Sequence, residues 1–264
     1  MKIVIISECK AREMLVLEKI LLQYPRAVVI QPTFSNNNKK RNWKGILKRI
    51  LVKARYGKLK RILYSSEKNT EIVNRVPFDV KQINSTEGIN FLKRLSPDLL
   101  ITCRAPLLKE EIINIPSMAA VNVHYGISPK YRGNDTLFWP LLFKDFDYIG
   151  GCLHLLNKGV DTGNILAEVY PALNKEDTET SIDIKTSELL GETLVKYIRK
   201  LEISRRTIPG IKQLDKGKNY RKNDRTIRKS LRLIFREIAG KQQIPNRPEK
   251  VVTHFEEESI SIFA

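Results

Sequence analysis

The sequence predicts an α/β fold, in which a mainly parallel, doubly wound sheet is followed by a small, mostly helical C-terminal extension. Short β-branched runs alternate with helix-length apolar patterns over the first two thirds of the chain. Strands and helices that alternate in this way form parallel sheets through right-handed crossovers. The chain has 264 residues, 42% of them hydrophobic, which is enough to bury a sizeable core.

The chain opens with a predicted β-α-β unit. We expect a strand in "KIVIIS" (2–7), a helix in "REMLVLEKILLQY" (12–24) and a second strand in "AVVIQP" (27–32). An insertion at about 36–66 then places apolar residues at helical spacing between lysines and arginines, which predicts a basic amphipathic helix. Two interpretations stay open: a helix packed on the core with a solvated positive face, or a surface that binds polyphosphate or an anionic membrane.

Two further strand–helix pairs and one strand follow. The strands are expected in "VKQIN" (80–84), "DLLITC" (98–103) and "AAVNVH" (119–124), and the helices in "EGINFLKRL" (87–95) and "KEEIINI" (109–115). These elements complete the parallel part of the predicted sheet.

The remaining elements are more varied. "DTLFWPLLFKD" (135–145) predicts a helix near Pro140, and "GGCLHLLNKGVDTGNILAEVYPAL" (150–173) predicts a strand, a glycine turn and a second strand. Residues 178–201 predict a long helix, and "KGKNYRKNDRTIRKSLRLIFREIAG" (216–240) contains a basic amphipathic helix.

The net charge of +18 is regional. Residues 39–61 and 199–236 each carry +11, so the rest of the chain carries −4. We divide the chain into a main domain over 1–203, which contains the candidate catalytic residues described below, and a basic extension over 204–264. We do not expect nucleic acid as the partner. A non-enzyme stays open as an alternative, namely a polyanion- or membrane-binding protein on an enzyme scaffold.

The cysteines and the apolar runs limit the cellular setting. Cys9, Cys103 and Cys152 are scattered singly, which is typical of reduced core residues and argues against a disulfide framework or a zinc site. No apolar run approaches the ~18 residues that span a bilayer. The start "MKIVIISECK" becomes charged too soon for a signal peptide. We expect a cytoplasmic protein that associates with a membrane at its periphery at most.

Polar residues stand where the strand 119–124 ends. Open parallel sheets bind ligands beyond the carboxyl ends of their strands, and strand alternation places Asn122 and His124 on one side. Asparagine supplies a neutral donor and histidine titrates near pH ~6.5. The later turn "NKGVDTGNI" presents Asp161, which either orients the imidazole or only caps its own backbone as an Asx turn.

"NVHYGISPKYRG" followed by "GVDTGNIL" resembles the signature of the folate-dependent formyltransferases. The resemblance implies a Rossmann-like fold, 10-formyltetrahydrofolate as co-substrate, no metal, and Asn122, His124 and Asp161 as catalytic residues. The chemistry agrees, because an amine that attacks a formyl carbon creates an oxyanion that needs hydrogen-bond donors. The amine must also lose a proton, to a histidine or to a water held by an aspartate.

The resemblance also assigns two folate-binding segments. One follows the strand 98–103, and the other precedes Asp161. An alternative stays open for Leu108 and Ile113, which suit an ordinary helix core equally well. The residues assigned to folate are Pro106, Leu108, Ile113, Leu156, Gly159 and Val160.

The loop after His124 departs from the family pattern. Members commonly read His-Pro-Ser-Leu-Leu-Pro, whereas this chain reads "HYGISP", with Gly126 in place of the serine. Lys130 and Arg132 are expected to contact the acceptor's phosphates, although Arg132 can instead pin the loop through backbone carbonyls. Tyr125 is expected either to stack on a sugar or base or to cover the core.

The acceptor is expected to be a nucleotide-linked amino sugar used for surface polysaccharide. The C-terminal extension is too short and too helical for the barrel of methionyl-tRNA formyltransferases, and "SECKARE" (7–13) lacks the phosphate-binding glycines of glycinamide ribonucleotide transformylases. A deformylase would carry an N-terminal regulatory domain before the first strand. Methionyl-tRNA or another amine remains the alternative acceptor. The other expected partners are folate, an anionic membrane surface and a second copy in a homodimer.

Overall fold

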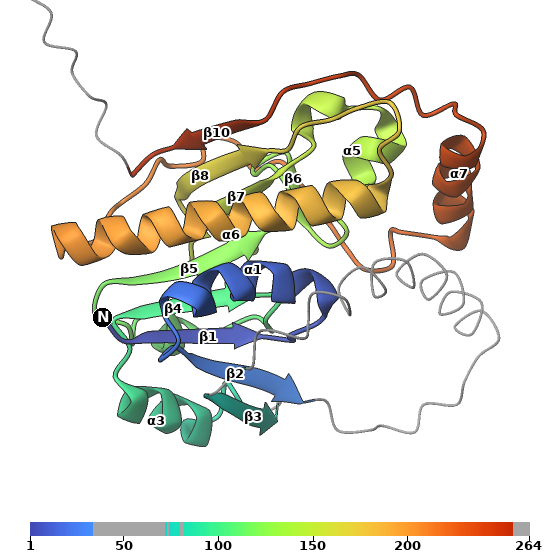
Figure 1. The fold of residues 1–264 in the computed structure, drawn as a ribbon. Coiled ribbons are helices and arrows are strands. Elements are labelled where there is room, and N and C mark those ends of the chain that lie inside the picture. The colour runs from blue at the N-terminus through green and yellow to red at the C-terminus, as the bar shows by residue number, and fades with distance from the viewer. Residues whose placement is uncertain (34–71, 73, 80–81, 256–264) are drawn as a thin grey trace, which may run out of the picture.

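An eight-stranded sheet forms the centre of the fold (Figure 1). In order across the sheet, its strands are β10 (Lys250–Thr253), β8 (Ile165–Tyr170), β7 (Gly151–Leu155), β5 (Ala119–His124), β4 (Leu99–Cys103), β1 (Ile3–Ser7), β2 (Val28–Thr33) and β3 (Arg75–Asp79). The strands from β3 to β5 pair in parallel, whereas β7, β8 and β10 pair antiparallel. The computed structural model describes residues 1–33, 72, 74–79 and 82–255. The insertion expected at 36–66, with its basic stretch, lies outside the described residues.

The predicted β-α-β opening is confirmed. β1 (Ile3–Ser7), α1 (Ala11–Gln23) and β2 (Val28–Thr33) form in that order, and every residue of β1 is buried. β1 lies between β2 and β4. This central place explains its continuous apolar run, because both of its faces are covered.

The third strand lies earlier in the chain than predicted. The expectation at 80–84 is wrong for 82–84, which form a turn, and β3 is Arg75–Asp79. Pro77 breaks the sequence signal of a strand, but β3 is the edge of the sheet, where a missing N–H is tolerated. The side chain of Asn84 instead ties the turn to the backbone of Leu107 and Lys109.

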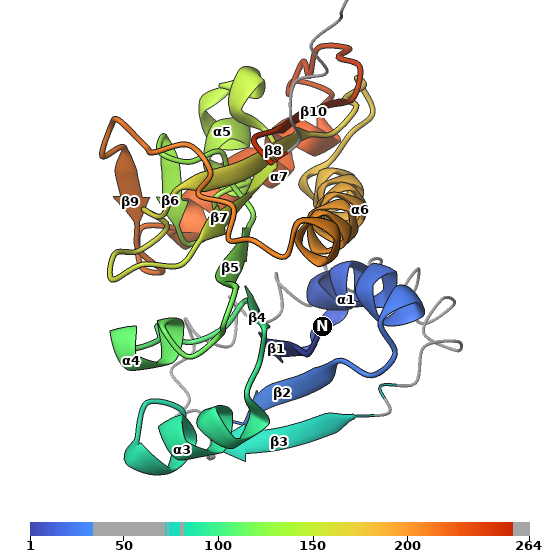
Figure 2. The same ribbon diagram turned by 90° about the vertical axis from the view of Figure 1, so that its left-hand side faces the viewer.

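Helices cover the two faces of the sheet as a doubly wound fold requires (Figure 2). α1 and α6 (Glu179–Ser204) pack together on one face. α3 (Thr86–Leu95) and α4 (Glu110–Ile113) lie on the other face. The apolar residues of each layer form their own buried cluster against the sheet. The predicted α/β class is therefore confirmed.

The predicted strands and helices that lead toward the site are present. β4 (Leu99–Cys103) and β5 (Ala119–His124) lie side by side in parallel. The antiparallel part contains β7 (Gly151–Leu155) and β8 (Ile165–Tyr170), joined by the predicted glycine turn. Between these parts of the chain lie β6 (Tyr131–Gly133), α5 (Phe138–Phe143) and the short helix η1 (Phe146–Tyr148).

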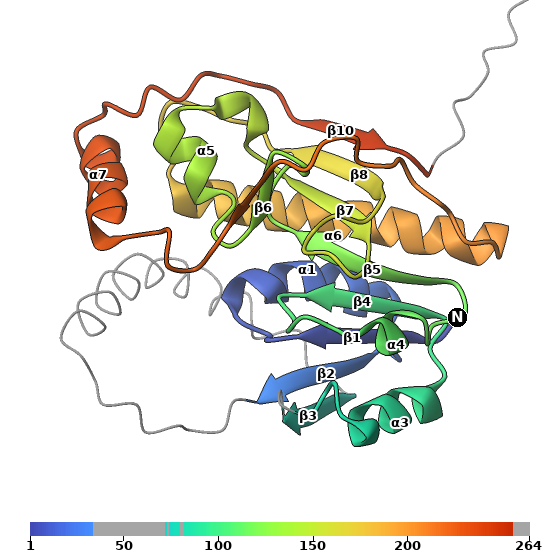
Figure 3. The same cartoon turned by 180° about the vertical axis from the view of Figure 1, so that it is seen from behind.

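The C-terminal segment contains the predicted helix, α7 (Ile227–Ile238), and two short strands that were not predicted. β9 (Lys218–Tyr220) pairs in parallel with β6, and β10 (Lys250–Thr253) pairs with β8 at the edge of the main sheet (Figure 3). The segment is thus joined to the main domain by strand pairing, and the domain division at residue 203 stays a prediction. Within the described part of the chain, no helix has the length and apolar character to cross a membrane.

Candidate active site

Asn122 and His124 point to the same side at the carboxyl end of β5, as strand alternation predicts. Asn122 lies opposite Thr102 of β4 and opposite His154 of β7. Its amide oxygen accepts a hydrogen bond from Thr102 Oγ1 at 2.8 Å. The other end of the amide, Nδ2, faces the Asp161 carboxylate, which can only accept, and this contact fixes the orientation of the amide.

Asp161 reaches this point from the turn between β7 and β8. Its Oδ1 accepts a hydrogen bond from Asn122 Nδ2 at 3.3 Å, and its Oδ2 lies 3.5 Å from His124 Nδ1. Oδ2 also accepts from the backbone N–H of Gly133 in β6 at 2.7 Å. The structure therefore brings Asn122, His124 and Asp161 together.

The Asx turn, which was the alternative role for Asp161, is formed by its neighbour Asn157. Asn157 Oδ1 accepts hydrogen bonds from the Gly159 N–H at 3.0 Å and from Thr162 Oγ1 at 2.8 Å, which closes the turn locally. The Asp161 carboxylate is thereby free to bond across the site, and its backbone adopts a left-handed φ of 51°.

The protonation of the His124–Asp161 pair follows from these contacts. His124 Nε2 lies 2.9 Å from the Tyr131 carbonyl, which can only accept, so Nε2 carries a proton. Burial lowers the pKa of His124 below its ordinary value, although the Asp161 carboxylate opposes this. Burial would raise the pKa of Asp161, but His124, His154 and the Gly133 amide together hold it well below its ordinary value. At neutral pH, Asp161 is thus ionised, and Nδ1 of His124 is free to take up a proton.

His154 of β7 is a member of the site that sequence reasoning missed. Its Nδ1 lies 2.8 Å from the Leu155 carbonyl and must donate to it, so Nε2 is the acceptor for Asn122 Nδ2 at 3.1 Å. Nε2 also lies 3.4 Å from Asp161 Oδ1. Only the antiparallel pairing of β5 with β7 places His154 opposite Asn122, and no sequence pattern gives that pairing.

The two segments expected to bind folate lie next to each other. Lys158 Nζ, in the turn before Asp161, forms an ion pair of 2.8 Å with Glu110 at the start of α4. Leu108 is buried in the core beneath α3 and α4, so the core alternative holds for its side chain. Leu107, which was not predicted, is 64% exposed.

The other residues assigned to folate differ in exposure. Val160 and Gly159 are exposed, and Pro106 is half-buried. Ile113 and Leu156 are also half-buried and pack against the same core cluster as Leu108. The exposed large apolar side chains of the two segments are therefore those of Leu107 and Val160.

The residues expected to bind the acceptor are held in ways the sequence could not settle. Tyr125 is 5% exposed, and the Arg12 guanidinium lies 3.9 Å from its ring centroid, so its ring covers the core, which is the second of the two alternatives expected for it. Arg132 donates to the carbonyls of Val160 and Gly217 at 3.4 and 3.2 Å, which pins the loop. Lys130 is exposed and pairs with Asp145 at 2.9 Å.

Gly126 is required by close packing. A Cβ atom there would lie 2.6 Å from Thr136 Cβ, 2.7 Å from the Tyr131 carbonyl and 2.9 Å from His124 Nε2. Glycine in place of the usual serine is therefore explained by the close packing around His124. It does not open space for an acceptor.

A second residue missed by sequence reasoning comes from the C-terminal segment. Gln213 Nε2 donates to the backbone carbonyls of Asp161 at 3.1 Å and Gly163 at 2.7 Å. The same segment approaches the loop after His124, since Gly217 would contact the Pro129 carbonyl if it carried a Cβ. Residues after α6 thus hold both loops of the site.

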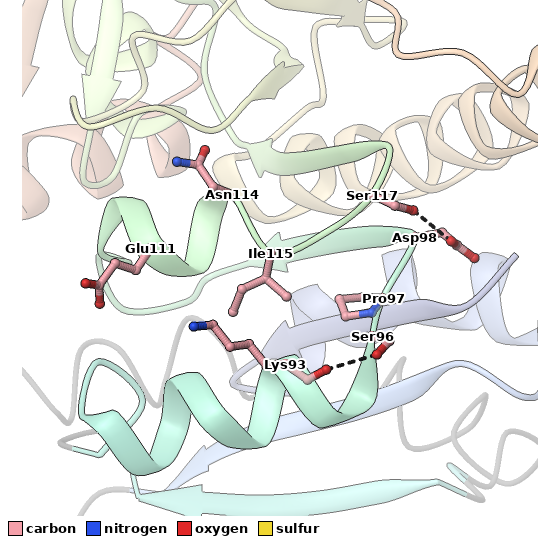
Figure 4. Close-up of a pocket in the computed structure, with 8 residues that line it drawn as sticks. All are labelled: Lys93, Ser96, Pro97, Asp98, Glu111, Asn114, Ile115 and Ser117. Carbon is pink, nitrogen blue, oxygen red and sulfur yellow. Dashed lines mark hydrogen bonds between the residues drawn. The ribbon is translucent and has the colours of Figure 1, made fainter.

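A pocket of about 470 Å³ lies elsewhere (Figure 4). It is at the amino-terminal edge of the sheet, because Asp98 and Ser117, which are hydrogen-bonded to each other, come just before β4 and β5. It is therefore separate from the cluster around Asp161. Its lining residues are Lys93, Ser96, Pro97, Asp98, Glu111, Asn114, Ile115 and Ser117.

Residues 26–198 match the protein family described as "Formyl transferase", and this region contains Asn122, His124, His154 and Asp161. The chain belongs to the formyl transferase family. Gln213 and Gly217 lie beyond the matched region, although they hold loops of the same site.

Curated relatives in the formyl transferase family are similar over part of their length. The bifunctional polymyxin resistance protein ArnA of Wigglesworthia glossinidia brevipalpis is 32% identical over 124 residues, which cover 46% of this chain and 19% of that protein. The methionyl-tRNA formyltransferase of Methylacidiphilum infernorum is 27% identical over 180 residues, or 67% of this chain and 54% of that protein. The chain thus spans about half or less of the length of these relatives.

Solved structures share the fold. A sugar N-formyltransferase from Shewanella sp. superposes with a TM-score of 0.58 at 15% identity, covering 88% of this chain and 86% of that one. An N-formyltransferase from Helicobacter canadensis, solved with folinic acid and dTDP-3-aminofucose, gives a TM-score of 0.56 at 18% identity, covering 91% and 80%.

Proposed function

We propose that this protein is an N-formyltransferase that moves a formyl group from 10-formyltetrahydrofolate to the amine of a nucleotide-linked amino sugar. The observation that carries the proposal is the position of the Asp161 carboxylate, which is hydrogen-bonded to Asn122 at 3.3 Å and lies 3.5 Å from Nδ1 of His124. A base, a hydrogen-bond donor and an orienting carboxylate are the groups that acyl transfer to an amine needs.

His124 and Asn122 have separate roles in the proposed reaction. The acceptor amine forms a bond to the formyl carbon, and negative charge develops on the formyl oxygen. Asn122 Nδ2 donates to that oxygen by giving up its 3.3 Å bond to Asp161, the longest of the three hydrogen bonds of its amide group. Nδ1 of His124 takes the amine proton, and Asp161 stabilises the imidazolium. The bond to the folate nitrogen then breaks, and the proton passes from His124 to that nitrogen.

The two segments beside the site suit folate as the formyl donor. Leu107 and Val160 present apolar side chains to solvent from segments that the Lys158–Glu110 ion pair holds together. Binding sites for flat ligands are lined mainly by apolar groups, with a few polar groups that fix orientation. Backbone N–H and C=O groups of the two segments supply such polar groups.

The choice of a nucleotide-linked amino sugar rests on the solved structures. The Helicobacter canadensis N-formyltransferase was solved with dTDP-3-aminofucose, and the Shewanella protein is described as a sugar N-formyltransferase. Both are covered over most of their length, which supports the same substrate class here. We propose surface polysaccharide biosynthesis as the process that uses such a sugar. Methionyl-tRNA is the second candidate acceptor, because a curated relative that covers 67% of this chain is named a methionyl-tRNA formyltransferase.

We further propose that the protein is cytoplasmic and forms a homodimer. The three cysteines are free, and Cys103 and Cys152 are buried, which suits a reducing compartment. The oligomeric state can be read by sedimentation velocity.

The proposed reaction can be tested by mass spectrometry. The protein is incubated with 10-formyltetrahydrofolate and either dTDP- and UDP-linked 3-amino and 4-amino sugars or methionyl-tRNA. We expect one sugar to gain the mass of a formyl group. His124→Ala should abolish the gain, and Asp161→Asn should slow it by about 10²–10⁴-fold. His254→Ala is the matched control, because His254 lies just after β10 and near Glu168, away from Asp161.

Two outcomes would contradict the proposal. Formylation of methionyl-tRNA alone would move the function to the second candidate. Turnover retained by both site variants, with their folding confirmed by thermal melting, would mean that the cluster around Asp161 does not carry the reaction.

A further inference from the structure

The outward face of α7 is apolar and exposed. Leu231, Phe235 and Ile238 are 47, 65 and 82% exposed, and their i, i+4, i+7 spacing puts them on one stripe of the helix. Figures 1 and 3 both place α7 at the margin of the molecule. Soluble proteins seldom expose large apolar side chains in a contiguous stripe without a partner for them.

The opposite face of α7 fixes the helix to the protein body. Leu233 is fully buried, and Arg236 donates a hydrogen bond to the Leu142 carbonyl of α5 at 2.9 Å. Lys229 lies over the Trp139 ring, 5.0 Å from its centroid. α7 is therefore anchored on one side, and the apolar stripe is the side that the described part of the chain leaves exposed.

Cations border the apolar stripe. A helical rotation of about 100° per residue places Arg228 and Arg232 along one border of the stripe, and Lys241 follows the end of the helix. All three are exposed. The acid of this helix, Glu237, is turned toward α6, where its carboxylate accepts the N–H of Glu179 at 2.9 Å. The border that faces outward is thus positively charged.

This charge pattern decides between the partners that could cover the stripe. A second copy that docked through the same face with its α7 antiparallel would set the arginine borders of the two copies against each other, with no acid of α7 between them. An anionic bilayer matches the pattern, because interfacial helices insert an apolar face of Leu, Ile and Phe and place Lys and Arg among the lipid headgroups.

We propose that α7 docks this protein on anionic phospholipid membranes. Leu231, Phe235 and Ile238 enter the boundary between headgroups and acyl chains, and Arg228 and Arg232 contact lipid phosphates. The inference does not depend on the proposed formyl transfer, since it rests only on the exposed stripe and its charged border.

Vesicle sedimentation tests the inference with the full chain at about 150 mM salt. The protein should sediment with vesicles of phosphatidylglycerol and phosphatidylcholine, and not with pure phosphatidylcholine. The variant Leu231→Ser/Phe235→Ser/Ile238→Ser should bind at least about tenfold more weakly, because it loses the three apolar side chains that enter the bilayer. Arg228→Gln/Arg232→Gln should also lose roughly tenfold or more.

Ile203→Ser is the matched control. Ile203 is an isoleucine near the end of α6 that is 82% exposed, as Ile238 is, but it has no place in the stripe. Its substitution should leave vesicle binding unchanged. Thermal melting of all variants confirms that each is folded.

Three outcomes would overturn the inference. One is vesicle binding that the triple serine variant does not weaken, which would assign the membrane contact to another part of the chain. Another is equal sedimentation with neutral and anionic vesicles. The third is a dimer in sedimentation velocity that the triple variant converts to a monomer without any vesicle binding, which would make the stripe a homodimer interface.

Discussion

Gln213 holds the backbone of Asp161 from outside the region that matches the formyl transferase family. Its side-chain amide donates to the carbonyls of Asp161 and Gly163 on both sides of the turn, at 3.1 and 2.7 Å. Asp161 adopts a left-handed φ of 51°, which costs a non-glycine residue about 1–2 kcal/mol. The two hydrogen bonds are of the size needed to offset that cost.

Replacing Gln213 by leucine should lower kcat by about tenfold or more while changing KM less. Leucine keeps most of the volume of the glutamine side chain but removes the two N–H donors of its amide. The turn should then relax and the Asp161 carboxylate should move away from His124. A misplacement of ~1 Å can lower a rate by about a hundredfold. Steady-state kinetics measure the split. Gln23→Leu, on the exposed end of α1, is the control. If Gln213→Leu and Gln23→Leu have equal kcat, and the wild type is active in the same assay, Gln213 has no positioning role.

His154→Phe should reduce kcat by about a hundredfold with little loss of folding. Phenylalanine fills the same space but cannot accept the Asn122 amide, which then loses its 3.1 Å bond and its orientation toward the formyl oxygen. The measurement is kcat at saturating folate and acceptor, with His254→Phe as the matched histidine variant. An unchanged kcat would show that Thr102 and Asp161 alone orient Asn122.

Elements whose structure depends on contacts close in sequence could be predicted, whereas those fixed by contacts distant in sequence could not. β1, α1 and β5 could be predicted because their apolar patterns are long and regular. β3 could not be placed, because Pro77 interrupts its pattern and only its edge position makes that proline acceptable. β9 and β10 span only three and four residues and are fixed by their partners β6 and β8.

The same limit applies to the site. Strand alternation within one segment places Asn122 beside His124, and that prediction is confirmed. His154 needs the pairing of β5 with β7, and Gln213 needs a contact across about fifty residues of chain, so neither has a local signal. The sequence left two roles open for Tyr125, because its contact with Arg12, far away in the chain, has no local signal.

The pH dependence of kcat/KM should have an acid limb set by His124. Catalysis needs its Nδ1 unprotonated, so the rate should rise with pH through a pKa below the ordinary value of 6.5. Asp161 raises that pKa by its charge, so Asp161→Asn should shift the limb to lower pH. The variant's plateau should also be lower, by about 10²–10⁴-fold. A limb that stays in place in the variant would mean that another group titrates.

Stability should also fall as the pH is lowered below about 6.5. Burial depresses the pKa of folded His124 below its unfolded value, so the contribution of this group is fully present above the unfolded pKa and is lost as pH falls toward the folded one. Urea unfolding at several pH values measures this. His124→Gln should flatten the dependence over that window, whereas His254→Gln should retain it.

Gly126→Ser tests whether the departure from the family loop serves the acceptor or the packing of His124. Because a Cβ atom would lie within 2.9 Å of His124 Nε2 and closer still to Thr136 and the Tyr131 carbonyl, the serine should force these groups apart. We expect a loss of about 1–3 kcal/mol in the free energy of unfolding. kcat should fall too, because Nε2 loses the carbonyl that fixes its tautomer. Unfolding in urea and kinetics on the same preparation measure the two effects. A serine variant with unchanged stability and a new acceptor preference would instead make position 126 a determinant of substrate choice.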